Sequence, residues 1–272
     1  MDFAWSYPLI NLRPGENRSG ISPGVKPSSS VPGIVHFFDR AYEGTPPWEI
    51  GRPQPEFVSL EDQGEIRGRV LDVGCGTGEN ALFYANRGHA TWGIDFAPLA
   101  IQRAERKNVA RGGTVHFTVA SALDLGALGE RFDTVTDCGM FHTFLDEHRP
   151  VYARSVASVL RPGGRLFVLC FSEREPNWGG PRRVTGAELR ATFADGWKVR
   201  AIRPARFETT QPEITGHAWL ASFELRPTHS RPTVPRAGRR VGAPPVPRSR
   251  GSASSARGSS PPRHERSPPH RP

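Results

Sequence analysis

The sequence contains only three cysteines, and their positions fit neither a disulfide framework nor a metal site. Cys75, Cys138 and Cys170 are far apart, and no CxxC pair or histidine cluster accompanies them. Disulfide-stapled domains need paired cysteines, and structural metal sites need closely grouped ligands. The sequence therefore predicts reduced thiols, no bound metal and a cytoplasmic location.

Long hydrophobic runs are also missing. No segment approaches the roughly 18 consecutive apolar residues that a membrane-spanning helix needs. No basic segment followed by an apolar stretch stands near the start of the sequence, as it would in a secretory signal. We therefore expect no membrane association.

Outside the C-terminal segment the sequence has no net charge. Residues 227–272 carry ten arginines against one acid, Glu265, which accounts for the whole formal charge of +9. This segment is rich in Arg, Pro and Ser and poor in apolar residues, so we predict a disordered tail. Residues 1–33 read as a flexible leader, which leaves 34–226 as one domain. The tail lacks interleaved aromatics or an RGG-type repeat, so a passive extension is favoured over nucleic-acid binding. We also expect the protein to be a monomer.

Within 34–226, strand-like and helix-like segments alternate, which is typical of a doubly wound α/β fold with helices on both faces of a mostly parallel sheet. The expected strands are 69–73, 91–94, 115–119, 132–136, 165–171, 197–202 and 217–225. The expected helices are 79–87, 98–111, 151–160 and 185–193, preceded by two at 33–42 and 54–64. The helices expected at 33–42 and 54–64 flank residues 45–53, a position that suits a lid over one edge of the sheet.

A glycine-rich loop follows the first of these strands, in the run VLDVGCGTG at 70–78. A strand that turns sharply into a helix exposes backbone N–H groups, and glycines let the chain pass close to a ligand. Gly74, Gly76 and Gly78 give GxGxG, whereas dinucleotide-binding proteins have GxGxxG. On its own this pattern indicates only a nucleotide-type ligand.

Two carboxylates and a second turn narrow the choice of ligand. Asp72 precedes the loop, where a carboxylate disfavours a pyrophosphate and suits a ligand with an ammonium group. Asp95 closes the next strand, where it can accept hydrogen bonds from ribose hydroxyls. The run LRPGG at 160–164 leads into a strongly apolar segment that fits a fifth strand.

Together these motifs resemble those of the class I, seven-stranded S-adenosylmethionine-dependent methyltransferases, and the resemblance covers about 34–226. Residues 48–55, which include Trp48, are similar to a segment of the thiopurine and halide/thiol methyltransferase-like group, whose members methylate small molecules. The resemblance implies a sheet of order 3-2-1-4-5-7-6 with only the seventh strand antiparallel. It also implies S-adenosylmethionine as cofactor and a small-molecule methyl acceptor.

The resemblance further implies individual cofactor contacts. The family often has an acid after the third strand that binds the adenine amino group; here Ser121 takes that place, beside Ala122. Asp137, after the fourth strand, is expected at the methionine end of the cofactor. Alternatives remain for the other positions: Asp72 can cap a turn, Asp95 can cap the helix near Pro98, and Trp48 can belong to the core.

The catalytic machinery is less well marked, because an activated sulfonium donor needs in-line placement of the acceptor more than a base. If a base exists, His142 is the candidate, since its ordinary pKa suits proton transfer at neutral pH; the alternative is a structural histidine. Phe141 and Phe144 can form a substrate wall or belong to the core. Residues 172–183, with Trp178, Arg182 and Arg183, can close over a substrate.

Two other functions compete with this interpretation. A NAD(P)-dependent oxidoreductase shares the fold and the ribose carboxylate, but it would favour GxGxxG and no acid at position 72. A nucleic-acid-associated methyltransferase is suggested by the basic tail. However, base amino-methylating enzymes of the class carry a Pro-Pro motif after the fourth strand, where this sequence has DCGM at 137–140.

Overall fold

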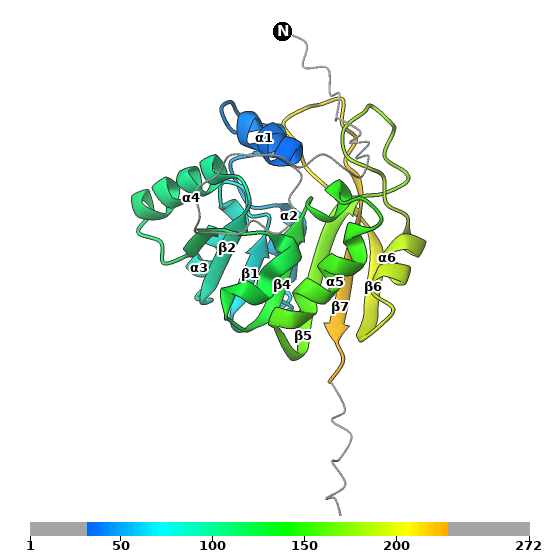
Figure 1. Ribbon diagram of the computed structural model, residues 1–272. Helices are drawn as coiled ribbons and strands as arrows, with labels where there is room; N and C mark the ends of the chain where they lie inside the picture. Colours follow the sequence, from blue (N-terminus) through cyan, green and yellow to red (C-terminus); the bar gives the residue numbers. More distant parts are fainter. Residues whose placement is uncertain (1–31, 228–272) are drawn as a thin grey trace, which may run out of the picture. The chain divides into compact units, whose positions relative to one another are not determined.

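A seven-stranded sheet forms the centre of the computed structural model, which describes residues 32–227 (Figure 1). The strand order is β3-β2-β1-β4-β5-β7-β6, and within the described residues β7 is the strand that runs antiparallel to its neighbours. The strands are β1 (Val70–Val73), β2 (Thr91–Asp95), β3 (His116–Val119), β4 (Phe132–Cys138), β5 (Leu160–Phe171), β6 (Trp197–Arg206) and β7 (His217–Leu225). The predicted order and the antiparallel seventh strand are confirmed.

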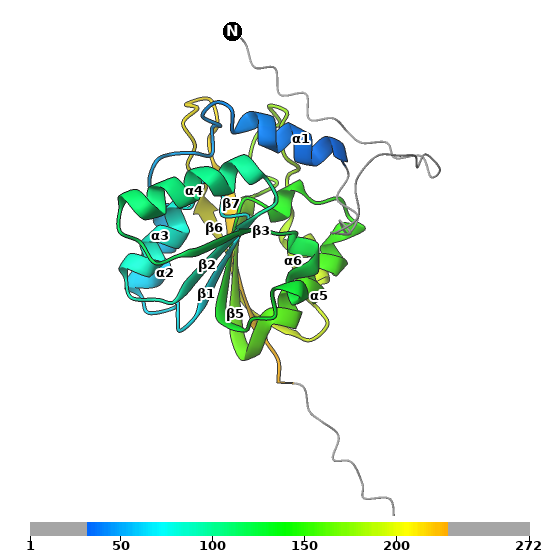
Figure 2. The same cartoon turned by 60° about the vertical axis from the view of Figure 1, so that its left-hand side comes forward.

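Helices cover both faces of this sheet, with α2, α3 and α4 on one side and α5 and α6 on the other (Figure 2). The helices are α1 (Pro32–Ala41), α2 (Pro55–Asp62), α3 (Glu79–Asn86), α4 (Pro98–Ala110), α5 (His148–Val159) and α6 (Gly186–Thr192). Two short 3₁₀ helices, η1 (Ala122–Leu128) and η2 (Phe141–Thr143), follow β3 and β4. The doubly wound arrangement is therefore confirmed.

The central strands are buried on both faces because helices cover both. All four residues of β1 are buried: Val70 packs with Phe57 and Tyr84 of α2 and α3, whereas Leu71 packs with Tyr152 of α5. Strands buried in this way read as continuous apolar runs. These apolar runs are why the central strands could be placed from the sequence.

Local signals set most of the helix ends. Pro98 stands at the first position of α4, where its missing N–H costs nothing. Thr185 and Glu188 form the predicted capping box at the start of α6, with reciprocal side-chain to backbone hydrogen bonds. α5 begins at His148, three residues before the expected start, because Pro150 falls within its first turn and is tolerated there.

The run at 160–164 differs from the expected tight turn, since it forms the first part of β5. Leu160 already pairs with Phe132, and the register of β4 against β5 shifts between Phe132 and Thr134. Gly163 takes a positive φ of 78° at this irregularity. The turn residues thus make an irregular strand entry, which the glycines permit.

The segment before the sheet lies over its carboxyl edge. α1 runs across the top of the molecule in both views, above the ends of the parallel strands (Figures 1 and 2). Residues 45–53, called the lid segment below, follow α1 and are held by the backbone of Thr210, whose N–H donates to Pro47 O at 2.8 Å. Phe57 and Leu60 then dock α2 on the sheet face.

The predicted leader (1–33) and tail (227–272) lie outside the described residues, apart from positions 32, 33 and 227. Within the described part of the chain, none of the helices combines the length and apolarity required to cross a lipid bilayer.

Candidate active site

A cavity opens at the carboxyl edge of the sheet, between the loop after β1, the lid segment and the ends of β4 and β5. Six of the candidate site residues singled out from the sequence line it: Trp48, Gly74, Gly76, Asp95, His142 and Trp178. Ligands of open α/β sheets bind at this edge, where the strand order reverses between β1 and β4.

The glycine loop forms one wall of the cavity, and its geometry excludes side chains. Gly74, Gly76 and Gly78 have positive φ of 69°, 54° and 88°. A Cβ on Gly76 would lie 2.8 Å from the Tyr42 hydroxyl, and one on Gly74 would lie 3.0 Å from Met140. The loop therefore needs glycine both for its conformation and for the close approach of its neighbours.

Asp95 is fixed at the end of β2 by the glycine loop itself. Its Oδ2 accepts from the backbone N–H of Gly76 at 3.0 Å, and its Oδ1 accepts from that of Ala97 at 2.9 Å. Burial raises the pKa of its carboxyl to about 6. A carboxylate has about four lone-pair sites, so Asp95 can still accept a hydroxyl donor at the cavity wall.

Asp72 is buried behind the loop and does not line the cavity. Its Oδ1 accepts from the Thr136 hydroxyl at 2.9 Å, whereas its Oδ2 has no hydrogen-bond partner of normal geometry among the described residues. The N–H of Ala81 points towards the carboxylate and lowers its pKa, but burial outweighs this effect and raises the pKa to about 7. A buried acceptor without a partner marks a place for a donor, such as a water or an ammonium group.

Asp137, Ser121 and Ala122 do not line the cavity. The Asp137 carboxylate accepts from the N–H groups of Met140 and Phe141 and from the Tyr152 hydroxyl at 2.7 Å. It thereby holds the turn after β4, and burial raises its pKa to about 6. The Ser121 hydroxyl accepts from the Leu123 N–H at 3.2 Å and caps η1. Cofactor contact by these residues stays a prediction.

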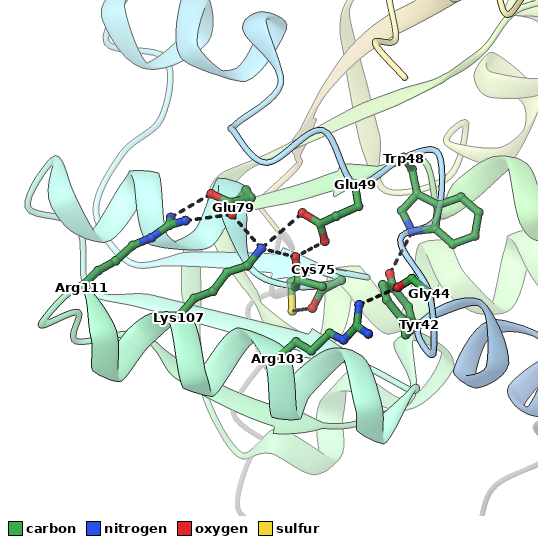
Figure 3. A network of polar contacts seen from close by, with 11 residues as sticks. Tyr42, Gly44, Trp48, Glu49, Cys75, Glu79, Arg103, Lys107 and Arg111 are labelled. Carbon is green, nitrogen blue, oxygen red and sulfur yellow. Dashed lines mark hydrogen bonds and ion pairs between the residues drawn. The ribbon is translucent and has the colours of Figure 1, made fainter. Parts of the chain in front are cut away.

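The lid segment contributes Trp48 and a partner that the sequence interpretation missed. The Trp48 indole N–H donates to the Tyr42 hydroxyl at 3.0 Å (Figure 3). The Trp48 ring also lies 5.7 Å from that of Phe38. Tyr42 is 4% exposed, and its hydroxyl also approaches Gly76. The lid segment is thus anchored against the glycine loop by aromatic contacts.

A charged network, also missed, ties the lid segment to α3 and α4 (Figure 3). Lys107 Nζ donates to Glu49 at 3.2 Å, to the Thr77 hydroxyl at 2.6 Å and to Glu79 at 2.7 Å. Thr77 also donates to Glu49, and Arg111 makes two hydrogen bonds to Glu79. Glu49 and Glu79 are 13% and 11% exposed, so solvent screens these contacts only partly.

His142, in η2, is 4% exposed and lines the opposite end of the cavity. Its Nδ1 accepts from the Phe171 N–H at 3.0 Å. Burial, with the positive charges of Arg183 and Arg149, lowers its pKa to about 3. A group with so low a pKa, and with one ring nitrogen already accepting, does not fit the general-base role suggested by the sequence.

Aromatic side chains surround His142. Its ring stacks on Phe171 at 4.9 Å with an angle of 5°, and Phe207 lies 5.8 Å from it. Trp178, from 172–183, packs edge-on to Phe171 at 5.6 Å and lines the cavity. Phe207, at the end of β6, was not anticipated because nothing in its local sequence marks it.

Other candidate wall residues have structural places. Phe141 is fully buried in the core beside α5, and Phe144 packs against the same core. Arg182 forms ion pairs with Asp146 and Glu188. Arg183 lies over the Trp178 ring at 4.4 Å and donates to backbone carbonyls of residues 175–181. Arg183 is therefore built into the loop beside the end of the cavity that His142, Phe171, Phe207 and Trp178 line, called the aromatic end below.

Residues 32–227 contain no group of three or more His, Cys, Asp or Glu side chains that could hold a metal ion. All three cysteines are free thiols, and burial raises the pKa of each above its usual value.

Comparison with known families gives a match to a methyltransferase domain over residues 70–164. The 2-heptyl-1-hydroxyquinolin-4(1H)-one methyltransferase of Mycobacteroides abscessus is 39% identical over 184 residues, covering 64% of this chain and 81% of the relative. The probable thiol methyltransferase 2 of Arabidopsis thaliana is 30% identical over 154 residues, covering 56% and 68%.

Solved structures share the fold of this chain. A protein studied for the conversion of a disulfide bond into a thioacetal group during echinomycin biosynthesis is 38% identical, with a TM-score of 0.65 over 71% of this chain and 93% of that chain. The 1,6-didemethyltoxoflavin-N1-methyltransferase of Burkholderia thailandensis, at 18% identity and a TM-score of 0.57 over 75% and 94%, shares the fold.

Proposed function

Because the chain belongs to the class I S-adenosylmethionine-dependent methyltransferases, we propose that it methylates a small molecule at the aromatic end of the cavity. The observation that carries this proposal is the continuity of the cavity from the glycine loop to the wall of His142, Phe171 and Phe207. A cofactor at the glycine loop would present its methyl group to an acceptor at that wall. The relatives described above are named for a hydroxyquinolone and for thiols, which are small molecules.

The residues at the glycine loop fit the cofactor. A side chain on Gly74 or Gly76 would fill the space beside Tyr42 and Met140 that a ligand can occupy. The buried Oδ2 of Asp72 has no hydrogen-bond donor among the described residues, and an ammonium group or a water can supply one. We propose that Asp95 binds the ribose hydroxyls, that Asp72 balances the methionine ammonium, and that Trp48 covers the cofactor from the lid segment. The bound sulfonium supplies an activated methyl group.

The protein's own part in the reaction is placement and exclusion of water. The lid segment and residues 172–183 border the cavity, and their aromatic side chains provide apolar walls without competing nucleophiles. Holding two reactants in line at near-contact distance replaces a bimolecular encounter by a unimolecular step. The expected reaction is in-line displacement at the methyl carbon.

The competing functions have less support. The family match and the relatives described above are methyltransferases, which leaves the NAD(P)-dependent oxidoreductase unsupported. For a nucleic-acid acceptor, the argument rests on the arginines of residues 228–272, and these lie outside the described structure. A cytoplasmic, monomeric protein remains our proposal, and the three free thiols are consistent with a reducing compartment.

An acceptor screen tests the proposal. The full chain is incubated with S-adenosylmethionine and a panel of thiols, hydroxylated heterocycles, heterocyclic amines and halides, and mass spectrometry follows products heavier by one methylene unit. An Asp95→Ala variant serves as control, since it should lose cofactor binding. Methylation of nucleic acid with none of the small acceptors would contradict the proposal.

A further inference from the structure

The hydrogen bonding of His142 indicates the protonation state in which a methyl acceptor binds, if the chain has the function proposed above. The backbone N–H of Phe171 donates to Nδ1, so the Nδ1 lone pair is occupied and the proton of the neutral ring resides on Nε2. A backbone amide cannot reverse its polarity, so this tautomer is fixed. The ring is held in place by stacking on Phe171 and by contact with Phe207.

The Nε2–H group then has no acceptor among the residues that the structure describes. Among residues 32–227, the ring's hydrogen bond is the one that Nδ1 accepts from Phe171. The side chain is 4% exposed and lines the cavity. The Nε2 atom is not among the fully buried side-chain atoms that lack a partner, so it faces the cavity, and what fills the cavity supplies its acceptor. His142 can therefore donate a hydrogen bond from Nε2 to an acceptor atom at the aromatic end of the cavity.

The electrostatic surroundings favour a negative charge at that place. Arg183 lies over the rings of Phe171 and Trp178 and makes no ion pair with a carboxylate within residues 32–227, although Glu175 is near enough to act on its charge. Arg149, 3% exposed, pairs with Glu188 and with Asp146. Both arginines disfavour an imidazolium at His142.

Other ionisable groups do not replace His142 as a base. The carboxylates that line the cavity, Glu49, Glu79 and Asp95, belong to the lid network and the glycine loop. At the aromatic end the remaining ionisable side chain is Cys138, and burial raises the pKa of its thiol. The described residues thus offer no group that would take a proton from the acceptor there.

We infer that His142 donates a hydrogen bond from Nε2 to the reacting heteroatom of a flat acceptor that enters the site as an anion. The acceptor loses its proton to water before it binds. Its lone pair forms the bond to the methyl carbon, and the carbon–sulfur bond breaks with its electron pair left on sulfur. The positive charge of the sulfonium and the negative charge of the acceptor cancel, so no proton is released in the cavity. Acidic thiols, phenols and N-hydroxy heterocycles have this chemistry.

The tautomer can be read without any acceptor. Long-range ¹H–¹⁵N NMR spectra of the full chain, with the His142 signals assigned from a His142→Gln variant, should show the Nε2–H form with no titration between pH 5 and 8. A ring that titrates near its ordinary pKa, or that carries its proton on Nδ1, would overturn the inference.

The acceptor state is tested with 4-nitrobenzenethiol, benzenethiol and phenylmethanethiol, which ionise at successively higher pH. The pH midpoint of kcat/KM should follow the ionisation of each thiol. His142→Phe, which fills the space but removes the donor, should lower kcat/KM for the thiols by about 100-fold, in line with loss of one preorganised donor. The dissociation constant of S-adenosylhomocysteine should stay unchanged.

Two variants separate donation from packing. His142→Gln keeps an N–H donor and should recover part of the activity lost in His142→Phe. His116→Gln, on the exposed edge strand β3, should behave as the native chain. One common midpoint near neutral pH for all three thiols would refute the inference, and so would methylation of neutral acceptors with none of the thiols. Absence of any methylated small molecule would instead refute the proposed function.

Discussion

At the scale of single residues, the buried carboxyl of Asp72 opposes folding in its charged form. It accepts one well-formed hydrogen bond, from Thr136, and Asp137 and Asp95 add negative potential to the effect of burial. Its pKa is thereby raised from 3.8 to about 7. The folded chain consequently binds this proton more tightly than the unfolded chain, and the group costs stability as pH rises towards and above 7.

The substitution Asp72→Asn removes that charge and should raise the free energy of unfolding of the cofactor-free protein at pH 8 by about 2–4 kcal/mol. The gain should shrink as pH falls below 7 and vanish below about pH 3, where this carboxyl is protonated in both the folded and the unfolded chain. Urea unfolding at several pH values measures it. Asp62→Asn, at an exposed residue paired with Arg87, is the control and should show no such pH-dependent gain. Equal stability of native and Asp72→Asn chains at pH 8 would contradict the account.

The close approach of Tyr42 to the glycine loop leaves no room for a side chain at Gly76, which lines the cavity. Gly76→Ala would bring a Cβ to 2.8 Å from the Tyr42 hydroxyl and would also strain the backbone at φ 54°. We expect S-adenosylhomocysteine binding to weaken by at least about tenfold, the equivalent of 1.4 kcal/mol. Calorimetric titration measures it.

Gly88→Ala provides the matched control, since Gly88 also has a positive φ, of 93°, but nothing lies within 4 Å of its Cβ position. It should cost stability through backbone strain alone and leave ligand affinity unchanged. Similar losses of affinity in the two variants would show that strain, and not the approach of Tyr42, governs the loop.

At the scale of elements, the Lys107 network joins the lid segment, the glycine loop, α3 and α4. One ammonium group satisfies Glu49, Thr77 and Glu79 together, so its removal leaves two largely buried carboxylates without their shared partner. Half-buried networks of this kind are worth more than isolated surface pairs. Arg111 continues to compensate Glu79, so the loss falls mainly on Glu49 and the lid segment.

Lys107→Met should therefore loosen the lid segment and raise KM for S-adenosylmethionine about 5- to 30-fold, which corresponds to roughly 1–2 kcal/mol. The effect on kcat should be smaller, because the aromatic end is untouched. Steady-state kinetics separate the two constants. Lys198→Met, on the exposed face of β6, is the control and should match the native chain. An unchanged KM in Lys107→Met would show that the network does not position the lid segment.

At the scale of the whole molecule, most of the fold could be predicted from local patterns. These signals depend only on residues close in sequence: apolar runs, proline at a helix start, the capping box and glycine turns. The differences arose where tertiary pairing decided the boundary. Leu160 joins β5 through its partner Phe132, and β6 continues to Arg206 because β7 pairs with it to His217. Local sequence does not reveal such partners.

The site divides in the same way. Asp95 and the glycine loop could be predicted because their motif spacing reflects consecutive strand ends. Tyr42 against Gly76, and Phe207 against His142, are contacts between segments far apart in the chain, so only the fold brings them together. His142 was found from its position after β4, but its protonation depends on the Phe171 N–H, which the sequence cannot show.

The charge distribution over the whole chain leads to a final prediction. Residues 227–272 contain all of the formal net charge of +9, so a chain ending at residue 226 is neutral overall. Among the residues that the structure describes, the cavity is lined by side chains between positions 38 and 214, and the last strand of the sheet ends at Leu225. Truncation should therefore leave kcat/KM for a small acceptor within about twofold, which is less than 0.5 kcal/mol.

The same truncation should abolish retention on a heparin column at low salt, because polyanion binding depends on clustered cationic side chains and weakens with ionic strength. A full-length variant with the ten arginines of this segment replaced by glutamine separates charge from chain length: it should elute with the truncated protein and keep full activity. Loss of methyl transfer in the truncated chain but not in the glutamine variant would give the segment a structural role. Loss in both would make its charge part of acceptor recognition and would revive a nucleic-acid acceptor.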